Sequence, residues 1–67
     1  MNIYITTMYR WGSKENHSYV CYAGINKYNA ISFGEKTKDN RGGKYDFEVL
    51  EFISDDPVSR KFIKKLE

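Results

Sequence analysis

The chain contains a single cysteine, Cys21, so no disulfide can form within its 67 residues. A structural zinc site needs four ligands, and His17 is the only other soft ligand present. Domains this small often depend on a disulfide, a metal or a partner subunit for stability. Because a disulfide is impossible and no metal or other cofactor is indicated, good packing or self-association remains as the source of stability. The 11 aromatic residues (six Tyr, four Phe and one Trp) suit both, and we expect a homo-oligomer, most simply a dimer.

Alternating β-branched and aromatic residues predict strands at 2–9 and 17–23, joined by a polar hairpin loop at 10–16. Asn26 is a suitable N-cap for a helix from Lys27 to about Lys38. Within this helix Gly34 indicates close approach to the sheet, because glycine otherwise weakens a helix by about 1 kcal/mol. The glycines at 42 and 43 are expected to end it.

A third strand is predicted over 44–53, where the apolar positions change parity between Val49 and Leu50. This change indicates either a bulge or a strand that buries different faces at its two ends. The run 55–57 (DDP) is a strong helix start, and the apolar residues that follow recur at spacing four.

The predicted fold is therefore a single α+β domain over 1–67 with the order β-β-α-β-α. It consists of a ββαβ core at 1–53 and a C-terminal helix at 54–67. The sheet is expected to have three strands, with the first strand in the middle and antiparallel to both neighbours, and the main helix packed on one sheet face.

The sequence favours no membrane partner and no nucleic acid. No apolar run approaches the roughly 20 residues that span a bilayer, and the N-terminus does not resemble a secretory signal. A lone cysteine favours a reducing compartment, so we expect a cytoplasmic protein. A formal net charge of +2 is too small to indicate nucleic acid, and the aromatic motif of an RNA-recognition domain is missing.

The residue types that carry catalysis are explained by other roles. His17 and Ser18 are adjacent on a strand and point to opposite faces, and Cys21 is typical of a small core residue. Asp46 and Glu48 share a strand face about 7 Å apart, a spacing open to acid–base work but more commonly found on an exposed sheet edge or face with lysine neighbours. We therefore expect a protein that is not an enzyme.

Two segments are candidates for holding a phosphate-bearing ligand. The run 41–44 (RGGK) combines flexible backbone with two cations, although Gly-Gly after a helix is also a plain stop signal. The run 9–11 (YRW) leads into the hairpin loop, with Tyr19 and Tyr22 on the returning strand. Tryptophan and arginine stack on bases and also anchor protein interfaces, while Trp11 is equally able to fold back as a lid on the core. The candidate ligand-binding residues are Tyr9, Arg10, Trp11, Tyr22, Arg41, Gly42, Gly43 and Lys44.

Several short runs carry a resemblance: AGI at 23–25, GEK at 34–36, RGGKY at 41–45 and EVLEF at 48–52. Through them the stretch 2–53 resembles small, uncharacterised ββαβ accessory proteins of tailed bacteriophages. That resemblance implies a phage counter-defence protein acting in the host bacterial cytoplasm, and it carries over no catalytic residue.

Together these considerations predict a non-enzymatic protein that sequesters a nucleotide second messenger of host immunity, of the cyclic-oligonucleotide or ADP-ribose type. Aromatic stacking and cationic phosphate contacts would hold the ligand. The first alternative is a protein–protein inhibitor of a host defence enzyme, such as a CRISPR nuclease, and a third class is a plain structural or assembly accessory.

Overall fold

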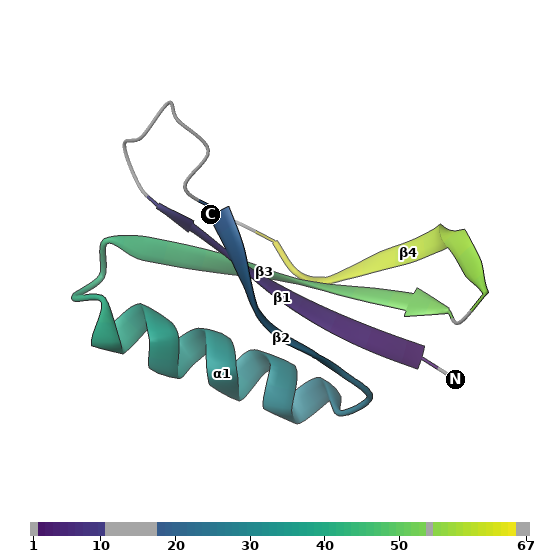
Figure 1. Cartoon of the computed structure of the whole chain (residues 1–67), viewed down its shortest axis with the longest axis horizontal. Coiled ribbons are helices and arrows are strands. Elements are labelled where there is room, and N and C mark those ends of the chain that lie inside the picture. Colours follow the sequence, from purple (N-terminus) through teal and green to yellow (C-terminus); the bar gives the residue numbers. More distant parts are fainter. Residues whose placement is uncertain (1, 11–17, 54, 66–67) are drawn as a thin grey trace.

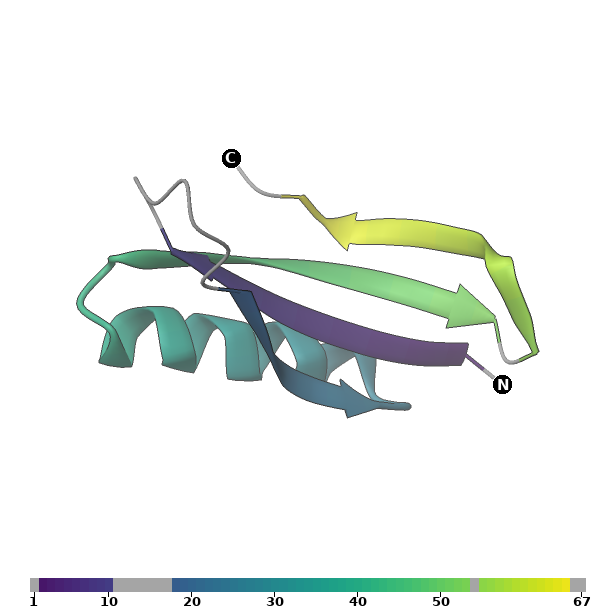
Figure 2. The same ribbon diagram turned by 45° about the horizontal axis from the view of Figure 1, so that its top comes forward.

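The computed structural model describes residues 2–10, 18–53 and 55–65 as a four-stranded antiparallel sheet with one helix (Figure 1). The elements are β1 (Asn2–Arg10), β2 (Ser18–Gly24), α1 (Lys27–Asn40), β3 (Tyr45–Ile53) and β4 (Asp56–Lys64). The order of the strands across the sheet is β2-β1-β3-β4, and the helix follows β2 in the chain. Figure 2 shows the helix lying across one face of the sheet, while the described part of the chain places no second layer on the other face.

The predicted three-stranded sheet with a C-terminal helix is wrong, because residues 56–64 form a fourth strand. Asp55 adopts the left-handed conformation, with a φ of 65°, and this allows a tight reversal directly after β3. The chain then returns along β3, where Phe62 pairs with Leu50 and Arg60 pairs with Phe52. Pairing with the open edge of β3 therefore overrides the local helix signals of the C-terminal segment.

β1 lies between β2 and β3 and is antiparallel to both. The register of β1 with β3 is continuous, whereas the register of β3 with β4 shifts between Val49 and Leu50. Ile63 of β4 is the extra residue at this shift, so the irregularity lies in the partner strand. β3 itself buries Phe47 and Val49 on one face and half-buries Leu50 on the other, the second of the two sequence-based alternatives.

The core lies between α1 and the sheet. Met8, Ala30, Phe47 and Val49 are fully buried there. The Thr6 hydroxyl donates a hydrogen bond of 2.6 Å to the Ala30 carbonyl, which ties β1 to the helix. Thr6 and Met8 therefore mark the helix-facing side of β1, and the alternate residues of that strand point to the open face.

Both ends of α1 are capped by the residues that the sequence indicates. The Asn26 side chain accepts a 3.0 Å hydrogen bond from the Asn29 backbone N–H, as an N-cap should. Gly42 and Gly43, with φ of 67° and 76°, turn the chain out of the helix and into β3. This turn fixes which residues gather at the C-terminal end of α1.

Candidate binding site

A cation and two aromatic rings meet where α1 ends and β3 begins. The Arg41 guanidinium carbon lies 5.6 Å from the centre of the Tyr19 ring and 5.4 Å from the centre of the Tyr45 ring. The two rings contact each other edge to face, with centres 5.8 Å apart and planes inclined by 71°. Such geometry holds a guanidinium by cation–π attraction, worth about 0.5–1 kcal/mol per pair at exposed sites.

Two further cations lie beside this cluster. Arg10 ends β1 directly opposite Tyr45, and Lys44 precedes Tyr45 in the chain. Both are exposed, as is Arg41, and no carboxylate of the described residues forms an ion pair with any of the three. We call Arg10, Tyr19, Arg41, Lys44 and Tyr45 the cationic end.

The acidic residues of β3 are engaged elsewhere. Glu48 accepts a 2.7 Å hydrogen bond from the Tyr9 hydroxyl, and Glu51 accepts one of the same length from the Tyr4 hydroxyl. These hydrogen bonds, together with burial, raise the pKa of both tyrosines above the ordinary value. Neither carboxylate forms an ion pair with Arg10, Arg41 or Lys44 in the described part of the chain.

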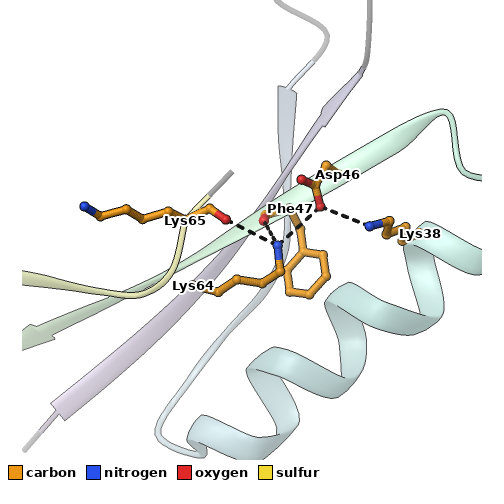
Figure 3. A network of polar contacts seen from close by, with 5 residues as sticks. All are labelled: Lys38, Asp46, Phe47, Lys64 and Lys65. Atoms are coloured by element: carbon orange, nitrogen blue, oxygen red, sulfur yellow. Dashed lines mark hydrogen bonds and ion pairs between the residues drawn. The ribbon is translucent and has the colours of Figure 1, made fainter. Parts of the chain in front are cut away.

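Asp46 is buried and holds two lysines (Figure 3). Its Oδ1 lies 3.5 Å from Lys38 Nζ of α1 and 3.3 Å from Lys64 Nζ of β4. The Lys64 ammonium also donates to the Phe47 carbonyl at 3.1 Å and lies 4.3 Å from the centre of the Phe47 ring. Asp46 thus links the helix to the last strand. The sequence left Asp46 and Glu48 open as an acid–base pair, and in the structure both carboxylates form contacts with other side chains instead.

The structure brings together five of the eight candidate ligand-binding residues: Arg10, Arg41, Gly42, Gly43 and Lys44. Tyr9 lies on the open face of the sheet, turned toward Glu48. The Tyr22 hydroxyl accepts a hydrogen bond from the Asn26 N–H at the start of α1, and the Tyr22 ring stacks on Phe33 in the middle of the helix with centres 5.3 Å apart. Trp11 lies outside the described residues, as does His17.

The glycines act as a helix stop rather than as an anion cradle. The Gly43 N–H bonds to the Lys38 carbonyl and the Gly42 N–H to the Asp39 carbonyl, each at 3.1 Å. Donors already used inside the helix cap cannot also bind a phosphate oxygen. The C-terminal end of a helix is moreover its negative pole. Anion binding at the cationic end would therefore depend on the side chains of Arg10, Arg41 and Lys44.

Sequence reasoning missed Tyr45 and left Tyr19 out of the binding set. The signal for Tyr45 was its place directly after the RGGK run, on the face of β3 that Phe47 and Val49 share. The Tyr19 hydroxyl is buried and has no hydrogen-bond partner among the described residues. A buried hydroxyl without a hydrogen-bond partner lowers the stability of the fold by about 1–3 kcal/mol. The contacts of the Tyr19 ring must therefore outweigh this loss.

Other chemistry receives little support from the described residues. Cys21 is half-buried at the β2 bulge, and burial raises the pKa of its thiol, which disfavours the nucleophilic thiolate. No group of three or more His, Cys, Asp and Glu side chains in the described ranges is arranged to hold a metal ion. The helix of the described part is neither long nor apolar enough to cross a membrane.

Comparison with protein-family models, with curated proteins and with solved structures finds no match for this chain.

Proposed function

We propose that this chain is a non-enzymatic binding protein that takes a phosphate-bearing nucleotide at its cationic end. The observation that supports the proposal is the Arg41 guanidinium, fixed over two tyrosine rings beside two exposed cations that lack carboxylate partners among the described residues. Sequestration needs only stacking and charge neutralisation, and this end of the molecule offers both.

The chemistry of Arg41 fits the two parts of a nucleotide. A guanidinium can stack on a base through its planar face and can donate hydrogen bonds to phosphate oxygens through its N–H edge. Stacking of one base contributes about 1–3 kcal/mol. Arg10 pairs with Tyr45 and Lys44 precedes it, so these two cations would neutralise further phosphate charge, as a cyclic oligonucleotide or an ADP-ribose-type signal would require. The counter-defence role in a host bacterial cytoplasm, implied by the phage resemblance, belongs to this proposal.

The test is isothermal titration of the purified protein with a cyclic dinucleotide, with ADP-ribose and with inorganic phosphate. Arg41→Ala should weaken nucleotide binding by about tenfold or more, the equivalent of at least 1.4 kcal/mol. Lys27→Ala is the matched control, because Lys27 is an exposed cation at the opposite end of α1. Affinity should also fall with rising salt.

Two outcomes would oppose the proposal. Equal losses in the Arg41→Ala and Lys27→Ala variants would show that attraction is unspecific and not located at the cationic end. Absence of binding to any nucleotide at millimolar concentration would leave the protein-inhibitor alternative as the better hypothesis.

A further inference from the structure

The two edges of the sheet differ in their protection against a further strand. β4 carries Pro57, which lacks a backbone N–H, together with Arg60, Lys61 and Lys64. Proline and charged residues on an edge strand discourage pairing with another chain. β2 (SYVCYAG) contains no proline and no charged residue. Its bulge at Cys21 leaves three regularly paired residues on either side. The edge open to strand addition is therefore β2.

Exposed apolar side chains border β2 on both faces of the sheet. Val20 pairs with Thr7, lies on the open face and is 56 % exposed. On the helix side Tyr22 stacks on Phe33, which remains 48 % exposed. A strand added at this edge places alternate side chains on the two faces and would cover both groups.

We propose that β2 pairs antiparallel with β2 of a second copy of this chain, which joins two four-stranded sheets into one of eight strands. A strand that pairs with its own copy across a two-fold axis forms a closed, isologous interface. Pairing of β2 with β4 would instead produce an open series of subunits, and the proline and cations of β4 disfavour it.

The two-fold axis of such a dimer is perpendicular to the sheet, so both helices lie on the same face. Phe33 of each copy then borders the junction, beside its own Tyr22. No charged residue of β2 must be desolvated in this arrangement. One pair of strands with these flanking contacts forms a small interface, in the class below about 1,200 Å² of total buried area, and a concentration-dependent dimer follows.

Sedimentation of the full chain from about 5 µM to about 500 µM tests the proposal, since this range brackets the affinities of small interfaces. We expect the apparent mass to rise from monomer to dimer. Amide hydrogen exchange in residues 18–24 should slow in parallel, while exchange in β4 stays constant, because only edge pairing adds hydrogen bonds to β2.

Val20→Lys should weaken the dimer by about tenfold or more, since it places two lysines at the junction. Phe33→Ser should weaken it without altering the strand. Phe62→Lys is the matched control, because Phe62 is 46 % exposed on the opposite edge strand. Circular dichroism confirms the fold of each variant, and Arg41→Ala should dimerise as the natural chain does.

Three results would overturn the proposal: a monomer across the whole range, growth beyond the dimer, or dissociation by Phe62→Lys while Val20→Lys still dimerises. The last would assign the interface to β4 or to the open face of the sheet.

Discussion

Replacing Gly34 by alanine should destabilise this protein, although alanine is the better helix former. Gly34 is buried in the middle of α1, directly against the ring of Phe47. A Cβ at this position would lie 2.5 Å from Phe47 Cε2 and 2.7 Å from Cγ, and closer still to Cδ2. Contacts this short do not occur between carbon atoms in folded proteins, so either the ring or the helix must move.

The cost follows from two opposing effects. Alanine gains about 1 kcal/mol over glycine in a helix interior. Inserting a methyl group into a filled core costs about 1–3 kcal/mol, and the upper end applies because Phe47 is fully buried and its ring has no free space to enter. The net loss is about 2 kcal/mol. For a domain of this size, such a loss lowers the melting temperature by roughly 8–16 °C.

Thermal and urea unfolding followed by circular dichroism measure this change. Ser32→Ala is the control, since Ser32 is exposed on the same helix and should gain a few tenths of a kcal/mol. Combining Gly34→Ala with Phe47→Leu should cost less than the sum of the two single changes, because the smaller side chain makes room for the methyl group. A Gly34→Ala protein as stable as the natural one would refute the close approach of helix and sheet.

Three further predictions concern the buried polar groups. Tyr19→Phe should stabilise the protein by about 1 kcal/mol, because it removes a hydroxyl without a hydrogen-bond partner. Tyr9→Phe should destabilise it by about 0.5–1.5 kcal/mol, because it removes the hydrogen bond to Glu48. Urea unfolding at neutral pH measures both changes in stability. The raised pKa of Tyr9 means that the folded state favours the protonated phenol. Its contribution to stability is therefore present below the unfolded value of about 10 and is lost as pH rises through the folded value. The melting temperature should fall above about pH 10, and less steeply in Tyr9→Phe. Asp46→Asn should lower the free energy of unfolding by about 1–3 kcal/mol, a range kept low because both lysines are partly exposed to solvent. Asp39→Asn, at an exposed position, should change it little in the same unfolding assay.

Local sequence signals were sufficient to locate the elements of the chain up to the end of β3. Alternation located β1, and it located β3 despite the change of parity after Val49, while Asn26 located the start of α1. Gly34 was predictable as a point of close approach, since a glycine in a helix interior needs a compensating contact. The central place of β1 followed from one hairpin and one helical crossover.

The C-terminal segment shows where local signals fail. Its acidic start, its proline and its apolar spacing of four all favour a helix, yet residues 56–64 form β4. The deciding groups are the backbone N–H and C=O groups on the outer edge of β3, which belong to the preceding strand and not to the segment's own side-chain pattern. A turn with Asp55 at positive φ brings the segment back to them. The spacing of apolar residues within one segment does not report whether that segment pairs with a neighbouring strand.

The cationic end was only half predictable, for a related reason. Arg41 and Lys44 are visible as a charged run, but the rings that position Arg41 come from two different strands. Which cations stay unpaired depends on where the carboxylates go, and Glu48 and Asp46 are taken by a phenol and by two lysines. The backbone N–H groups of the turn glycines donate hydrogen bonds to helix carbonyls and do not point to an outside ligand. An anion bound here would therefore be held by charged side chains and not by backbone N–H groups of this turn. Its binding should therefore be more sensitive to salt and to Arg41 than binding in a backbone cradle would be.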